Sequence, residues 1–253
     1  MAPSDRAIRR LTPPGAVFVC LLVGWFLAAA RTPAILLPAP TAVLDAVLTD
    51  PTAFLQAGAV SAVTASGGLG LGVVAGLGLA FVAVGSEPGR AVIEPAVVGF
   101  RIAPLTAIAP LVLLWFGTGI AVRAILVALM TTFPITIASI DGLESTPRRY
   151  LDLLDSVGAS RWERFRAVRI PAALPSVFAG VKLAAALAVT GTVGAELLTL
   201  RGGLGACVWY AGRIFRTAER FAYLMTVALF GVVFYGAAAG AEQVVIRRWG
   251  IDD

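Results

Sequence analysis

Six apolar runs, each close to the length that a helix needs to cross a bilayer, dominate this sequence. A spanning helix needs about 20 mostly apolar residues. The runs are Pro14–Ala30, Ala57–Gly85, Val92–Phe116, Ile120–Ile140, Leu174–Leu200 and Phe221–Val245. The chain of 253 residues is 58% hydrophobic and only 14% charged, whereas a soluble domain carries about 25% charged residues. We therefore expect an all-α membrane protein with six transmembrane helices. The composition excludes a disordered chain, a collagen-like fibre and a disulfide-rich secreted domain.

The first run admits two interpretations. Arg6, Arg9 and Arg10 precede it and Ala28–Ala30 end it, as in a cleaved signal peptide. Five further runs need no cleavable leader, so we expect a retained first span. The predicted segments are a cytoplasmic tail (1–13), the first span (14–30), an outer segment (31–56) with a short helix over 42–48 capped by Thr41, a core of five spans (57–245) and a tail (246–253).

Arginine placement predicts the orientation, because cytoplasmic loops carry an excess of Lys and Arg. With the N-terminus inside, twelve arginines fall on cytoplasmic segments and five on outer ones. Four of those five lie in one outer loop, 201–220, and oppose this orientation. The Arg-rich, Lys-poor composition is typical of a bacterium. We predict a multi-pass protein of the bacterial cytoplasmic membrane with both termini in the cytoplasm. The basic residues lie in short pieces between apolar runs, which does not favour nucleic-acid binding.

Residue types that the chain lacks limit its chemistry. Histidine is absent, and the two cysteines, Cys20 and Cys207, are far apart in sequence. Neither a His/Cys zinc site nor a Ser-His-Asp triad can be built from this set. We expect no metal, no cofactor and no disulfide, and an intramembrane enzyme is disfavoured.

The second run is dense in glycine. Gly68, Gly72 and Gly76 recur every fourth residue, which places small residues on one helix face and lets another helix approach closely. Such a face serves either packing within the chain or contact with a second subunit. We favour packing within the chain, because small-residue faces are common in helical bundles.

The longest hydrophilic segment, 144–173, reads as a pair of capped helices. Thr146 is predicted to be an N-cap, with Pro147 at the first helical position. Apolar residues follow at helical spacing, and acidic ones lie on the other side. The apolar residues are Tyr150, Leu151, Leu154 and Val157, and the acidic ones are Asp152 and Asp155.

A rigid turn and a second helix follow. Gly158 is placed to end the first helix as a C′ glycine, and Ser160 with Glu163 forms a capping box for the next. Pro171 is predicted to end that helix and Pro175 to allow a fresh start. Lipid binding by an interfacial helix pair is the alternative. The apolar residues are few and bulky and the turn is fixed, which favours insertion of this segment into a pocket over lipid binding.

The stretch Asp152–Pro175 resembles the EAA loop of binding-protein-dependent ABC importer permeases. Gly158, Ala159, Ser160, Trp162, Phe165 and the Pro171/Pro175 pair match that pattern, whereas Asp152 stands where the family has Glu and Leu153–Leu154 replace Ala-Ala. Leu37–Thr41, Pro104–Gly117 and Ala195–Gly205 are similar to segments of the nitrate/sulfonate/taurine subfamily. The resemblance implies a type I ABC importer permease (MetI-like) core with a cytoplasmic coupling loop.

The same resemblance implies partners and roles. The partners are an ATP-binding ABC subunit, an extracytoplasmic solute-binding protein, a second permease subunit that forms a homodimer, and membrane lipid. The chain has no Gly-x-x-x-x-Gly-Lys-Ser/Thr motif, so hydrolysis falls to the partner. The implied ATPase-coupling residues are Tyr150, Asp152, Leu154, Asp155, Gly158, Ala159, Ser160, Arg161, Trp162, Phe165, Pro171 and Pro175.

Polar residues within the runs are candidates for the translocation path, because charge at membrane depth is costly. The candidates are Arg101, Lys182, Thr192 and Glu196. Lys182 and Glu196 are about 21 Å apart along a helix, which is too far for a salt bridge. Snorkelling is favoured for Lys182, and packing for Thr192 and its neighbour Thr190. A pathway role and an interfacial position are equally compatible with Glu196. Arg101 is compatible with two roles, attraction of an anion near the path and anchoring of the end of a span.

The implied function is transport of a small polar solute. The subfamily handles nitrate, sulfonates, taurine and pyrimidine-type vitamin precursors. An ion-gradient-driven secondary transporter is the alternative, although we find no internal repeat of the kind such folds carry. A structural membrane scaffold would not explain the capped loop.

Overall fold

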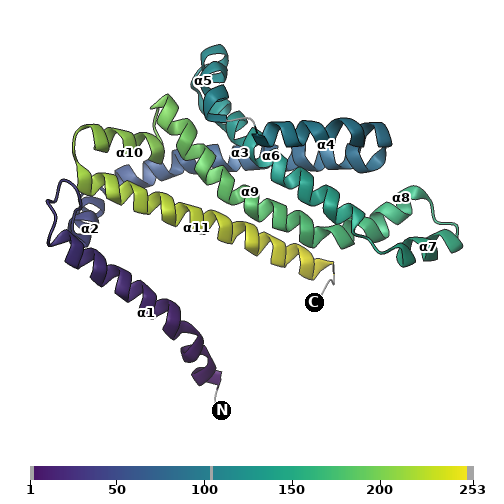
Figure 1. The fold of residues 1–253 in the computed structure, drawn as a ribbon, viewed down its shortest axis with the longest axis horizontal. Helices are drawn as coiled ribbons and strands as arrows, with labels where there is room; N and C mark the ends of the chain where they lie inside the picture. Colours follow the sequence, from purple (N-terminus) through teal and green to yellow (C-terminus); the bar gives the residue numbers. More distant parts are fainter. Residues whose placement is uncertain (1–2, 103–104, 250–253) are drawn as a thin grey trace.

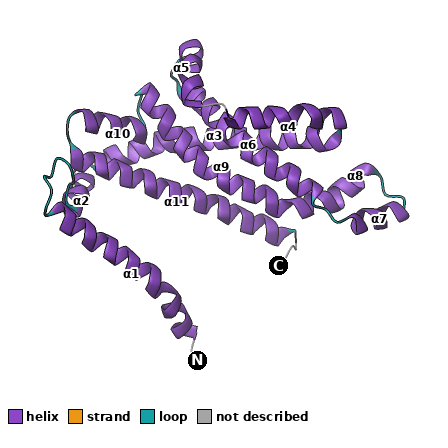
Figure 2. Ribbon diagram, in the orientation of Figure 1, coloured by secondary structure: helices purple, strands orange, loops and turns teal. Residues whose placement is uncertain are grey.

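The computed structural model describes residues 3–102 and 105–249, and this part of the chain is helical with no strand (Figure 2). The elements are α1 (Pro3–Ala29), α2 (Pro40–Thr49), α3 (Pro51–Gly85), α4 (Glu87–Ile102), α5 (Leu105–Phe116), α6 (Ile120–Glu144), α7 (Arg148–Ser156), α8 (Arg161–Arg164), the π-helix η1 (Phe165–Arg169), α9 (Ile170–Thr199), α10 (Leu204–Arg213) and α11 (Thr217–Arg248).

Four helices are long and apolar enough to cross a membrane. They are Pro51–Gly85, Ile120–Glu144, the continuous helix Arg161–Thr199 and Thr217–Arg248. These match four of the six predicted spans. The apolar part of α1, Gly15–Ala29, is shorter, so the total of six spans stays a prediction. Within the described part of the chain both cysteines are free.

The third predicted span, Val92–Phe116, is not one described helix. α4 ends at Ile102 and α5 begins at Leu105, with residues 103–104 outside the described ranges. Pro95 and Pro110 lie inside α4 and α5. The described residues of this run therefore lie in two segments, α4 and α5, and a single span over Val92–Phe116 stays a prediction.

Glycines allow α3 to pack closely against α6. A Cβ added at Gly68 or Gly72 would overlap Val127 or Thr131, and one at Gly76 would lie 2.9 Å from Ile135. The glycine face therefore packs within this chain, as we predicted. The contacts advance in the same direction along both helices, so α3 and α6 run parallel. The chain between them returns through α4 and α5.

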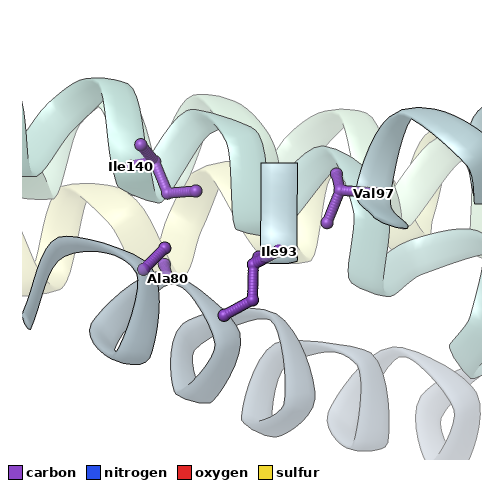
Figure 3. Close-up of a cluster of buried hydrophobic side chains, with 5 residues drawn as sticks. Ala80, Ile93, Val97 and Ile140 are labelled. Carbon is purple, nitrogen blue, oxygen red and sulfur yellow. The ribbon is translucent and has the colours of Figure 1, made fainter. Parts of the chain in front are cut away.

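A small apolar cluster ties α4 to this pair. Ala80 of α3, Ile93 and Val97 of α4 and Ile140 of α6 meet there and are at most 8% exposed (Figure 3). Ser86 starts α4, since its hydroxyl accepts a hydrogen bond from the Gly89 N–H at 3.1 Å. The cluster fixes the end of α3 nearest to α7 and α8.

The bundle has two distinct ends (Figure 1). α2 and α10 lie at one end, whereas α7 and α8 extend from the other. α1 points away from the bundle and is held near α2, where the Trp25 indole N–H donates to the Pro38 carbonyl at 3.1 Å. The prediction that Thr41 caps α2 is wrong. Ala39 is the N-cap and Pro40 begins the helix, a position that suits the fixed φ of proline.

Candidate functional site

The first part of the candidate site is the turn between α7 and α8. Gly158 has φ +75°, a left-handed conformation that favours glycine. Its N–H donates to the Asp155 carbonyl at 3.1 Å, and the Ala159 N–H donates to the Leu154 carbonyl at 2.9 Å. This pair of bonds is the Schellman pattern that satisfies a helix C-terminus. The predicted glycine stop is confirmed.

The predicted capping box starts α8. The Glu163 N–H donates to the Ser160 hydroxyl at 3.2 Å, and the Ser160 N–H donates to the Glu163 carboxylate at 2.7 Å. The hydrogen bonds from Ser160 lower the pKa of Glu163. The two helices are also tied by an ion pair between Arg164 and Asp155. The turn therefore has one fixed shape.

The predicted start of α7 is wrong by one position. Pro147, not Thr146, is the N-cap, and α7 begins at Arg148. Thr146 is buried, and its hydroxyl has no hydrogen-bond partner among the described residues. The side chain is turned into the protein and away from the free N–H groups of the helix.

The predicted proline exit is also wrong. Pro171 lies in the first turn of α9, and Pro175 lies inside that helix. The five residues before α9 form a π-helix in which the Ile170 N–H donates to the Phe165 carbonyl. The backbone bonding before Pro171 is therefore i→i−5 rather than i→i−4, and proline, which has no N–H, follows without ending the helix. α8, η1 and α9 consequently form one continuous rod of 39 residues.

α7 presents apolar side chains to the outside. Val157 at its end is 72% exposed and Leu153 63%, while Tyr150 is 45% exposed with Arg149 over its ring. None of its residues is buried. Asp152 is exposed as well. Among the described elements, α7 packs extensively against none. Its apolar residues are therefore available to a partner.

α8, by contrast, is anchored to the bundle by aromatic rings. Trp162 stacks on Phe165 with the centroids 6.0 Å apart, and Phe165 meets Phe81 of α3 edge-on at 5.3 Å. Arg161 is exposed beside them. The ring contacts give α8 a second attachment, to α3, besides its continuity with α9.

A buried carboxylate forms the second part of the site, at the opposite end of α9. Glu196 is fully buried. It accepts from the Ser61 hydroxyl of α3 at 2.8 Å and from the Gly205 N–H of α10 at 2.9 Å. Arg123 of α6, also buried, lies 3.9 Å away. The carboxylate thus links four helices and is enclosed by them.

The loop before α10 is shaped around this carboxylate. Gly202 and Gly203 have φ of +74° and +93°, and a Cβ at Gly203 would overlap the Glu196 carboxylate. Arg123 donates to the Gly202 carbonyl at 3.2 Å. The Leu204 N–H donates to Ser61 at 2.9 Å. An anion at the N-terminus of α10 is stabilised by the helix dipole.

Lys182 is ion-paired rather than snorkelling. Its ammonium lies 2.7 Å from the Glu242 carboxylate of α11, and both side chains are at most a quarter exposed. Helix packing brings together two residues 60 positions apart. The favoured interpretation of Lys182 is therefore wrong, because a carboxylate on the neighbouring helix neutralises it within the bundle.

The remaining path candidates are Thr192 and Arg101. Thr192 is buried one turn before Glu196, and its hydroxyl has no partner among the described residues. Thr190 is exposed and donates to the Ala186 carbonyl. The side chain of Arg101 lies outside the described part of the chain. Sequence reasoning missed Ser61, Arg123 and Glu242 as partners. Arg123 and Glu242 are charged residues inside apolar runs, which was the available signal.

Comparison with known proteins gives the family. The model of the family described as "Binding-protein-dependent transport system inner membrane component" matches residues 68–249. The chain is 32% identical over 228 residues to a probable ABC transporter permease protein of Haemophilus influenzae, with 89% of this chain and 93% of that protein covered. The chain belongs to this family of inner membrane components.

Relatives with named substrates place it more closely. It is 37% identical over 155 residues to the riboflavin transport system permease protein RibX of Chloroflexus aurantiacus, covering 61% of this chain and 58% of that protein. It is 29% identical over 224 residues to the taurine transport system permease protein TauC of Escherichia coli, covering 85% and 81%. The chain is an ABC importer permease of the nitrate/sulfonate/taurine type, integral to the inner membrane.

Solved structures share the fold. An amino acid ABC transporter structure has a TM-score of 0.61 at 16% identity, covering 81% of this chain and 97% of that one. An inward-facing MetNI methionine ABC transporter has a TM-score of 0.58 at 18% identity, covering 76% and 94%. These likenesses establish the MetI-like fold. The alternative of an ion-driven secondary transporter finds no support in the comparisons.

Proposed function

We propose that this chain forms the translocation path of an ATP-driven importer and that the α7–α8 loop couples it to a separate ATP-binding subunit. The solute is a small polar molecule, either a nitrate-, sulfonate- or taurine-like anion or a pyrimidine-type vitamin precursor. A solute-binding protein delivers it, and two copies of the chain form the permease. The termini and the loop lie on the cytoplasmic side.

The observation that carries the proposal is how the loop is attached. A lever must be stiff, must engage a partner at one end and must be tied to the moving helices at the other. The Gly158 turn and the capping box supply stiffness. The exposed apolar residues of α7 supply a docking surface. The continuous α8–η1–α9 rod and the Phe165–Phe81 contact tie the loop to two bundle helices.

The buried charges support the rest of the proposal. Glu196 joins α3, α6, α9 and α10 at one end of the bundle, and Lys182 joins α9 to α11. Both pairs involve α9, the helix that continues from the loop. A movement of α9 would therefore act on every helix that these two charge pairs connect.

Photo-crosslinking tests the docking surface. Benzoylphenylalanine placed at Val157, the C-cap of α7, which is 72% exposed, should crosslink to the ATP-binding subunit when the transporter is assembled. The matched control is the same residue at Leu114 of α5, which is 77% exposed, and it should give no such product. Crosslinking from Leu114 but not from Val157 would refute the assignment of the loop.

A further inference from the structure

A pocket of about 580 Å³ lies where the α7–α8 loop meets the end of α3. Its apolar wall consists of Phe81 and Val84 from the last turns of α3, Leu151 of α7, Trp162 of α8 and Phe165 of η1. Phe81 and its neighbour Val82 are each about half exposed. The apolar wall thus continues into the outer apolar surface of α3.

Apart from Gly85, the rest of the pocket lining is cationic. Arg161, Arg164 and Arg169 line it, and no acidic residue does. Arg164 is paired with Asp155. Neither Arg161 nor Arg169 is paired with a carboxylate in the described part of the chain. At least two positive charges therefore line the pocket without a counter-charge from the described residues.

We propose that this pocket binds one anionic phospholipid, with the headgroup phosphate between Arg161 and Arg169 and an acyl chain along Phe81 and Val84. The proposal rests on the cytoplasmic placement of the loop given above. Arginine is suited to phosphate because its planar guanidinium donates two parallel hydrogen bonds. Basic pockets between membrane helices at the cytoplasmic face bind anionic headgroups.

The shape of the pocket favours a lipid over a soluble anion. Inorganic phosphate would use the arginines and leave the apolar wall in contact with water. A phospholipid satisfies both the arginines and the apolar wall, because its charged headgroup and its apolar chain are joined in one molecule. A bound lipid would also brace α8 against α3 beside the Phe165–Phe81 contact.

Native mass spectrometry of the purified full chain in detergent tests this site without the ATP-binding subunit. We expect phosphatidylglycerol to be retained in preference to phosphatidylcholine. Each arginine removed should weaken retention about fivefold, so the double variant Arg161→Gln/Arg169→Gln should lose about 25-fold. The control Arg148→Gln/Arg166→Gln removes the same charge outside the pocket and should retain the lipid.

A second variant blocks the apolar side. Gly85 lines the pocket, and a Cβ there meets no atom within 4 Å. Gly85→Leu should therefore fold and exclude the lipid, whereas Gly78→Leu, equally free of clashes but outside the pocket, should not. Equal retention of both lipids, or unchanged phosphatidylglycerol retention in the double-arginine variant, would overturn the proposal.

Two results would point to another occupant and also overturn it. One is complete displacement of phosphatidylglycerol by millimolar inorganic phosphate, which would indicate a soluble-anion site. The other is loss of the ATP-binding subunit in Arg161→Gln/Arg169→Gln with lipid retention unchanged, which would make the pocket a protein contact. Loss of the ATP-binding subunit from loop variants that keep the lipid site bears only on the coupling function.

Discussion

Phe165, the first residue of the π-helix, meets Phe81 of α3 edge-on, with the ring centroids 5.3 Å apart and the planes at 89°. The contact crosses from the loop to the helix whose glycine face is seated on α6. It therefore gives the loop a route to α3 and α6 that does not pass through α9.

The ring pair should be energetically coupled. An edge-to-face pair contributes about 0.5–1.5 kcal/mol beyond its buried area. We expect Phe81→Leu and Phe165→Leu, which keep most of the apolar area, to show a coupling of this size in a double-mutant cycle of thermal unfolding in detergent. The control cycle pairs Phe165→Leu with Phe26→Leu on the distant α1 and should be additive. Additivity for Phe81 and Phe165 would mean that the contact does not form.

The glycine face should tolerate no side chain at its centre. A Cβ at Gly72 would overlap Thr131, and overpacking a buried contact costs about 1–3 kcal/mol. We expect Gly72→Ala to lower the unfolding temperature. Gly70→Ala, two residues away with nothing within 4 Å of its Cβ, should leave it unchanged or raise it. Equal unfolding temperatures for the two variants would argue against the α3–α6 packing.

Removal of the buried carboxylate should be far more costly than removal of an exposed one. Glu196→Ala leaves Arg123 buried without its counter-charge and deprives Ser61 and the Gly205 N–H of their acceptor. Breaking such a pair costs about 3–5 kcal/mol. Glu94→Ala, which removes an exposed partner of Arg90, should cost at most about 1 kcal/mol. Comparable unfolding temperatures would show that Glu196 is not buried in the network.

Exchanging the two charges of the Lys182–Glu242 ion pair should restore the stability that either single substitution removes. Lys182→Glu places a carboxylate against Glu242, and Glu242→Lys places two ammonium groups together. Each should destabilise the protein by about 1.5–3 kcal/mol, the contribution of hydrogen bonds to charged groups. The exchange Lys182→Glu/Glu242→Lys should recover most of that loss. A double variant no more stable than the singles would mean that the residues do not meet.

Part of the local geometry was predictable from the sequence. The Gly158 turn, the Ser160–Glu163 capping box and the Gly68/Gly72/Gly76 face depend on residue types at fixed spacing within one or two helices. The conformational needs of these three motifs are intrinsic to the residues, so spacing was sufficient to place them. The caps predicted at Thr41 and Thr146 were wrong, because the structure starts each helix at a different residue.

Long-range pairing and the response to proline were not predictable. Ser61 meets Glu196 across 135 positions of sequence, and Glu242 meets Lys182 because α9 and α11 pack together. The sequence around each residue gives no indication of its partner. Pro171 considered alone predicts a helix end. In the structure a π-helical segment precedes it and the helix continues. In each case the outcome depends on how whole helices are arranged.

ATP-driven solute uptake by Gly158→Val, compared with Gly158→Asn, tests the coupling role of the loop most directly. Gly158 has φ +75° with nothing within 4 Å of an added Cβ, so a substitution acts through backbone conformation alone. β-branched residues disfavour this conformation, whereas asparagine tolerates it. The account predicts that Gly158→Val stays in the membrane but loses both the ATP-binding subunit and uptake, while Gly158→Asn keeps both. Normal association and uptake by Gly158→Val would contradict it.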